Sequence, residues 1–159
     1  DSLLDYFSEE EIKDNINYDY YSYIEDKTFI DVSIINNNFK NYEGIQVAIK
    51  RSDTKYIVYA ISGGIFYGEN IAECHKKMKI ISNEISSMFK NSKKNLNFKQ
   101  AHPKDKTGKS TALADIFFLD TGSVAVRCTD WSDEMTKKYN WIDNIRVSIK
   151  SKEFNDWLE

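Results

Sequence analysis

Apolar and polar residues alternate along two segments in the first third of the chain. Residues 30–34 and 45–49 both place isoleucine or valine at every second position, with polar residues or alanine between them. This period of two predicts two half-buried strands. In the run 56–61, the residues that would face either side of a strand are apolar or aromatic, which predicts a central strand. Gly63 and Gly64, which follow it, would permit a bulge or the close approach of another element.

The pattern becomes helical after residue 70. Asn70, with Glu73 three residues later, has the spacing of a helix N-cap. Apolar residues then recur at steps of three and four, which predicts a helix of about twenty residues lying across a sheet. A coiled-coil partner helix is the alternative for such a stripe. The stripe consists of Ile71, Cys74, Met78, Ile81, Ile85 and Met88.

Short elements are predicted in the last third of the chain. Residues 116–119 and 124–128 have the pattern of paired strands, and 145–149 alternate as a final strand. Residues 132–139 predict a short helix. Apolar residues within 154–158 share one face of a closing helix.

The N-terminal region supplies a further helix and a tyrosine-rich connection. Ser8 and Glu11 have the spacing of a capping box, which predicts a short amphipathic helix. Residues 17–23 predict an ordered connection whose rings lie against the sheet, with a sugar-stacking surface as the alternative. The predicted fold is α+β: a single antiparallel sheet of about six strands, one long amphipathic helix packed on one face, and short helices at both termini. We expect one domain over residues 1–159.

Composition agrees with a folded globular chain. The 159 residues include 41% apolar and 30% charged residues, with one proline and six glycines. No apolar run reaches the length of a membrane span, so we expect a soluble chain. The net charge of −3 gives no general attraction for nucleic acid.

Positive charge is concentrated in one segment, which is predicted to be a polar loop at about residues 90–112. Residues 90–109 contain seven lysines and one aspartate. Such a loop could bind an acidic protein or another polyanion, and the alternative is a solvated connection. The candidate residues for an anionic partner are Lys93, Lys94, Lys99, Lys104, Lys106 and Lys109.

The two cysteines, Cys74 and Cys128, both fall on predicted buried faces. If the long helix packs on the strand that carries Cys128, a disulfide could join them; two buried free thiols are the alternative. A disulfide and a chain that begins without methionine both favour an exported protein, periplasmic or extracellular, whose signal peptide has been removed. A cytoplasmic location is the alternative.

One short stretch resembles a catalytic loop. Residues 119–123, LDTGS, resemble the active-site loop of aspartic proteases, and the resemblance implies Asp120 as a catalytic carboxylate. That chemistry uses two carboxylates sharing one proton, so a chain with one loop would have to dimerise. The same residues are typical of a hairpin turn, in which Asp120 begins the turn and Gly122 adopts positive φ.

Other possible motifs lack the residues or the spacing that their function requires. Residues 107–110 resemble the end of a phosphate-binding P-loop, but Pro103 stands where the pattern needs its first glycine. The cysteines and histidines lack metal-ligand spacing, so we expect no metal and no cofactor. Trp131 and Trp141 are interpreted as core residues rather than the lining of a ligand pocket. The sequence therefore predicts an exported binding or interaction domain without an evident catalytic motif, with a carboxylate-dependent hydrolase using Asp120 as the alternative.

Overall fold

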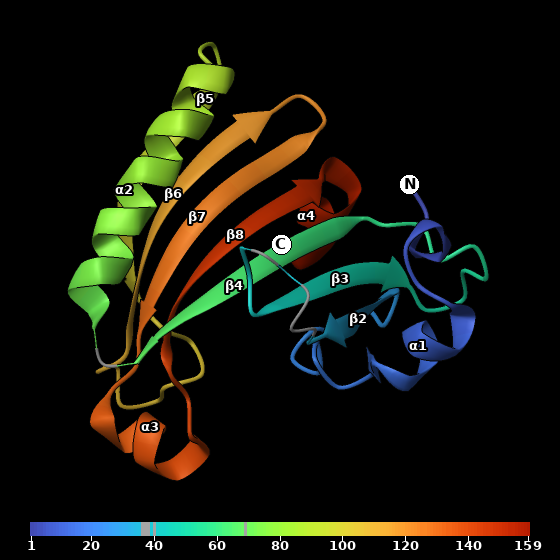
Figure 1. Ribbon diagram of the computed structural model, residues 1–159, viewed down its shortest axis with the longest axis horizontal. Coiled ribbons are helices and arrows are strands. Elements are labelled where there is room, and N and C mark those ends of the chain that lie inside the picture. Colours follow the sequence, from blue (N-terminus) through green and yellow to red (C-terminus); the bar gives the residue numbers. More distant parts are fainter. Residues whose placement is uncertain (36–38, 40, 69) are drawn as a thin grey trace.

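The computed structural model describes residues 1–35, 39, 41–68 and 70–159. Over these residues the chain forms one eight-stranded antiparallel sheet in the order β1-β2-β3-β4-β8-β7-β6-β5 (Figure 1). The strands are β1 (Ile16–Asn17), β2 (Phe29–Ile34), β3 (Gly44–Lys50), β4 (Ala60–Gly68), β5 (Lys93–Ala101), β6 (Thr111–Leu119), β7 (Gly122–Asp130) and β8 (Asp143–Ser151). The helices are the 3₁₀ helix η1 (Leu3–Asp5) and the α-helices α1 (Glu9–Asp14), α2 (Ile71–Met88), α3 (Asp133–Tyr139) and α4 (Lys152–Leu158).

The predicted antiparallel α+β fold is confirmed, but the predicted number of about six strands is wrong. The two additional strands are those at the edges of the sheet, β1 and β5. β1 has only two residues, too few to show a period. β5 is exposed along nearly its whole length and therefore lacks the apolar alternation that marks a half-buried strand. The loop predicted at about 90–112 is consequently shorter, because residues 93–101 belong to the sheet.

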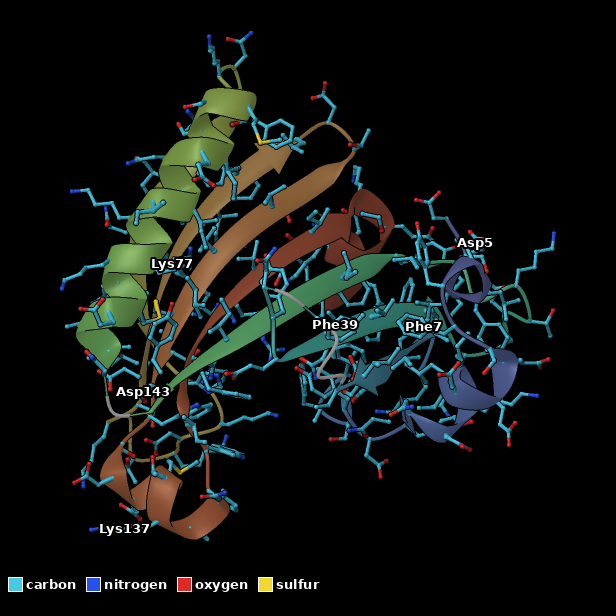
Figure 2. The ribbon with its side chains drawn as sticks, in the orientation of Figure 1. Asp5, Phe7, Phe39, Lys77, Lys137 and Asp143 are labelled. Atoms are coloured by element: carbon cyan, nitrogen blue, oxygen red, sulfur yellow. A yellow bond between two sulfur atoms is a disulfide. The ribbon has the colours of Figure 1, made fainter. Side chains whose placement is uncertain are left out.

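Side chains on one face of the sheet build most of the core. Residues 124, 126 and 128 of β7 pack with alternate residues of β8 against α2 (Figure 1). The same face continues across β2 and β3, where Ile12 of α1 covers the sheet. Phe7 and Phe39 pack against this second cluster (Figure 2). We call this side of the sheet the α2 face.

The opposite side of the sheet carries mainly polar residues on its central strands, and we call it the polar face. α4 lies on the polar face, where Phe154 packs with Phe29, Ala48 and Ala60. The predicted long helix on one face and short helices at both termini agree roughly with the structure, in which α2 and the C-terminal helix lie on opposite faces. Ser151, the last residue of β8, is the N-cap of α4, because its Oγ accepts a hydrogen bond from Phe154 N at 3.2 Å. The final strand thus passes directly into a capped helix.

The two cysteines meet between α2 and the sheet. Cys74 and Cys128 are both buried, and their sulfur atoms lie 2.02 Å apart, at disulfide distance. The N-cap that the sequence predicts for α2 is also present, since Asn70 Oδ1 accepts a hydrogen bond from Glu73 N. Helix register and strand alternation therefore placed both cysteines correctly.

The paired glycines of β4 permit a close approach rather than a bulge. A Cβ at Gly63 would lie 2.6 Å from the ring of Tyr42, which packs directly on the strand. The register of β4 against β8 shifts further along, between Phe66 and Gly68. The predicted strand at 56–61 also lies further along the chain, because β4 begins only at Ala60.

Candidate anion-binding site

Three cationic side chains come together at the centre of the polar face. Arg127 on β7 is directly opposite Arg146 on β8, and Lys150 lies four residues further along β8, opposite Ser123. Side chains alternate between the two faces of a strand. Because Val126, Val147 and Ile149 belong to the α2 face, all three cations must project from the polar face.

Two segments flank these half-buried cations and form a partly open cavity of about 150 Å³, which we call the cationic pocket. On one side lie Tyr20, Tyr21 and Tyr23 of the connection between β1 and β2, and on the other lie residues of α4. The two segments contact each other, since the Tyr21 ring lies 5.8 Å from the ring of Phe154 and 5.2 Å from that of Trp157. The prediction that the tyrosines of residues 17–23 lie against the sheet is therefore confirmed for Tyr20 and Tyr21.

Arg146 is held by hydrogen bonds within the pocket. It donates to the hydroxyl of Tyr20 at 3.1 Å and to Oε1 of Gln46. The Tyr20 hydroxyl in turn donates to the same oxygen of Gln46 at 3.1 Å. Arg146 is therefore positioned by side chains from two other elements.

Arg127 and Lys150 have no such partners. Within the described residues, neither forms a hydrogen bond or an ion pair with its side chain. Burial lowers the pKa of Arg127, and the neighbouring Arg146 lowers it further. Burial, followed by repulsion from both arginines, lowers the pKa of Lys150 to about 8. The charged forms of both side chains are therefore destabilised in the pocket relative to water.

Asp31 is the one carboxylate that lines the cationic pocket among the described residues. It is 1% exposed, and its Oδ2 accepts hydrogen bonds from Ser33 and Gln46. Its Oδ1 has no hydrogen-bond partner in the described part of the chain. Burial raises the pKa of Asp31 to about 6, against the opposing effects of Ser33 and Arg146. A single carboxylate leaves the three cations with an excess of positive charge at neutral pH.

This arrangement can bind an anion. Guanidinium and ammonium groups donate strong hydrogen bonds to carboxylate, phosphate and sulfate oxygens. An unpaired charge removed from water is unfavourable until a counter-charge arrives. Here the donors of Arg127 and Lys150 face a cavity and are unused, so an anion would satisfy both.

An aromatic cluster borders the pocket near α3. The ring of His102 lies 4.2 Å from that of Trp131, which lies 4.4 Å from that of Trp141. Lys104 connects this cluster to the pocket, because its ammonium lies 5.4 Å from the Tyr20 ring and 5.8 Å from the Trp141 ring. Trp131 and Trp141 are half-buried and belong to none of the buried clusters described above, so the interpretation of both as core residues was wrong.

The six lysines proposed for an anionic partner do not form one surface. Lys94 is on the α2 face, where its ammonium donates to Ser86 at 2.6 Å, and Lys99 shares that face. Lys93 pairs with Phe118 and projects from the polar face. Lys109 lies 3.9 Å from Glu134, and Lys106 is exposed in the loop after β5. Of the six, Lys104 is the one that lies beside the cationic pocket.

Asp120 lies outside the candidate site. It is exposed in the two-residue turn between β6 and β7. The glycine of the Asp-Thr-Gly sequence has a structural role, because a Cβ at Gly122 would lie 1.9 Å from the carbonyl oxygen of Lys150. A glycine is therefore needed for β7 to approach β8 closely at this point.

Sequence reasoning missed the site. The alternation at residues 145–149 predicts a strand but assigns no role to Arg146 and Lys150. The available signal was that Arg127 and Arg146 are two of only three arginines in the chain. Each lies between two apolar residues of its strand, Arg127 between Val126 and Cys128 and Arg146 between Ile145 and Val147. The sequence did not show that α4 and the tyrosines of residues 17–23 lie over these cations.

Comparison with known proteins identifies no relative. The chain matches no protein-family model, no curated protein and no solved structure. Among the described residues, no group of three or more histidine, cysteine, aspartate or glutamate side chains is arranged to hold a metal ion. In the same part of the chain, no helix has the length and apolar character needed to cross a membrane.

Proposed function

We propose that this protein is an exported binding domain that holds the anionic group of a small ligand in the cationic pocket. One observation carries the proposal: Arg127 and Lys150 project into a cavity in which, among the described residues, neither side chain has a hydrogen-bond or ion-pair partner. Arg146, fixed by Tyr20 and Gln46, supplies a third cation. The residues that build the pocket come from β2, β3, β4, β7, β8, α4 and the tyrosine connection.

The cysteine pair supports a location outside the cytoplasm. Disulfides persist in oxidising compartments such as the periplasm and the extracellular space and are rare in the cytosol. The paired sulfurs are fully buried between α2 and β7, where they hold the long helix on the sheet. Their role is therefore structural, separate from the ligand site on the opposite face.

Sulfate binding tests the proposed pocket directly. We expect sulfate to bind the wild-type protein, and we expect Arg127→Met or Lys150→Met to weaken binding by about tenfold to hundredfold, as for lost charge-assisted hydrogen bonds. Isothermal titration calorimetry at low ionic strength measures the affinity. Lys99→Met is the matched control, because Lys99 is exposed on the other face. Equal weakening by all three substitutions would show a general charge effect and would contradict the proposal.

The affinity for sulfate should depend on pH in two steps. Above pH 8 the free protein loses the proton of Lys150, whose pKa is about 8, so affinity should fall as pH rises through this value. Below pH 6 Asp31, whose pKa is about 6, becomes neutral, so affinity should rise as pH falls. His102 has its pKa lowered to about 4, and burial raises the pKa values of Tyr21 and Tyr23 above their ordinary range, so none of these groups titrates between the two steps.

Calorimetry from pH 5 to pH 10 measures both steps, because sulfate keeps its charge over this range. Asp31→Asn should remove the lower step and Lys150→Met the upper one. An affinity that is constant across the range would contradict the assignment of Lys150 and Asp31 to the binding site.

A further inference from the structure

A second, larger hollow adjoins the cationic pocket on the polar face, and its lining also includes Ile34, Phe39, Tyr42 and Ile45 from the α2 face. It has a volume of about 500 Å³ and shares Gln46, Ser62 and Arg146 with the pocket. A volume of this size is in the range of cavities that hold small organic ligands. The anion site is therefore one end of a longer depression rather than an isolated cavity.

Two glycines give the hollow its floor. Gly44 on β3 pairs with Gly64 on β4, so neither strand places a side chain on the polar face at this position. Two apolar residues flank the position of the glycine pair. Ile35 lies over Gly44, with its Cγ1 3.5 Å from the place that a Cβ of Gly44 would occupy. Phe66 is two residues after Gly64, on the same face of β4. Ile35 is 83% exposed and Phe66 is 52% exposed, so both present apolar surface to solvent. We call the part of the hollow lined by Ile35, Gly44, Gly64 and Phe66 the apolar groove.

The charges near the two ends of the apolar groove differ in sign. Arg146 stands at the end shared with the cationic pocket, whereas Glu43 lines the hollow away from that pocket. Glu43 is fixed there, since its Oε2 accepts a hydrogen bond from Phe66 N at 3.0 Å. An anionic head is attracted to Arg146 and repelled by Glu43, and a hydrocarbon body gains by covering Ile35 and Phe66.

We propose that the ligand is an amphiphilic anion, a carboxylate with an unbranched aliphatic chain, whose head occupies the cationic pocket and whose chain lies in the apolar groove. This inference rests on the proposed function, because it uses the same pocket for the head. It adds the class of ligand and the position of the second binding surface, between β3 and β4.

Straight-chain carboxylates from acetate to octanoate, titrated by calorimetry at pH 7, test the inference. Burial of each methylene contributes about 0.8 kcal/mol, so each one that enters the groove should tighten binding about fourfold. We expect octanoate to bind at least about a hundredfold more tightly than acetate. Arg127→Met should weaken binding of both, because they share one head site.

Gly64→Leu isolates the groove. A side chain at Gly64 meets open space, with Ile145 O as the nearest heavy atom at 3.9 Å, and the backbone there has no positive φ. The variant should therefore fold and still bind acetate and sulfate, and it should lose most of the additional affinity that the wild-type protein has for octanoate over acetate. Gly64→Ala, which adds one methyl group, should have a smaller effect, and it provides a second test if the leucine variant is unstable.

The outcomes separate the two proposals. If neither sulfate nor acetate binds, the proposed function is wrong. If acetate binds but octanoate binds no more tightly, or if Gly64→Leu and Gly64→Ala both leave the chain-length dependence unchanged, the groove assignment is wrong and the anion site stands. If octanoate affinity is unaffected by Arg127→Met, the head lies elsewhere and the inference is overturned.

Discussion

Reducing the bond between Cys74 and Cys128 is expected to lower the free energy of unfolding by about 4 kcal/mol. The two cysteines are 54 residues apart in the sequence. In the chain-entropy description, a cross-link that closes a loop of this length restricts the unfolded chain by about that free energy. The loop contains all of β5 and β6 and most of α2, so reduction should destabilise the attachment of the long helix to β7.

Urea unfolding with and without a reductant measures this effect. Alkylation in denaturant followed by intact-mass determination establishes the starting state: no labels without reduction and two labels after it are expected for the oxidised protein. The double variant Cys74→Ala, Cys128→Ala is the control, because its stability should not respond to the reductant. Two labels on the native, unreduced protein would contradict the disulfide and remove the main support for export.

Arg127→Met is expected to stabilise the protein, by about 1–2 kcal/mol, while it weakens anion binding. The reason is that Arg127 is a half-buried cation whose side chain has no hydrogen-bond or ion-pair partner in the described part of the chain, and this partial burial lowers its pKa. Replacing such a charge by an apolar side chain of similar length removes the desolvation penalty and retains the packing of the aliphatic stem. A gain in stability combined with a loss of binding is typical of a residue kept for function.

Arg146→Met is the matched comparison and should act in the opposite direction, lowering stability by about 1–3 kcal/mol. It removes the donor to the Tyr20 hydroxyl and one of the two donors to Gln46 Oε1. It also removes the cation whose charge opposes the raised pKa of Asp31. Urea unfolding in buffer without sulfate or phosphate compares the two variants, with unchanged m-values as the check on the comparison. If Arg127→Met destabilises as much as Arg146→Met, Arg127 is a structural residue and the main observation behind the anion site is lost.

The sequence predicted the parts of the fold that one local pattern determines. The apolar stripe from Ile71 to Met88 has the bounds of α2, and the alternation at 30–34 and 145–149 lies within β2 and β8. Cys74 and Cys128 were paired because each belongs to such a pattern. Local periodicity indicates which face of a helix or strand is buried. The type and position of an element are therefore predicted well where one of its faces is strongly buried.

The edge strands and the anion site could not be predicted in this way. β5 is polar on both faces because an edge strand has one neighbour and little burial. The site depends on contacts between distant parts of the chain: Arg146 meets Tyr20 across 126 residues and Gln46 across 100. A single sequence shows that Arg127, Arg146 and Lys150 alternate with apolar residues, but whether such a face meets water or a cover is decided by tertiary structure.

Three of the seven lysines of residues 90–109, namely Lys93, Lys94 and Lys99, lie on the edge strand β5, where their charge has a consequence for contacts between molecules. An edge strand presents unpaired backbone groups to which a second chain could add. Along β5, lysines project from both faces, and the strand is interrupted between Asn95 and Phe98, where Asn97 has φ of +56°. At the other end of the sheet, β1 has only two residues. The charges and the irregular backbone of β5 oppose the addition of a strand from a second molecule at that edge. At the other edge, β1 is too short to pair with such a strand over more than two residues. The positive segment is thus suited to keeping neighbouring molecules apart.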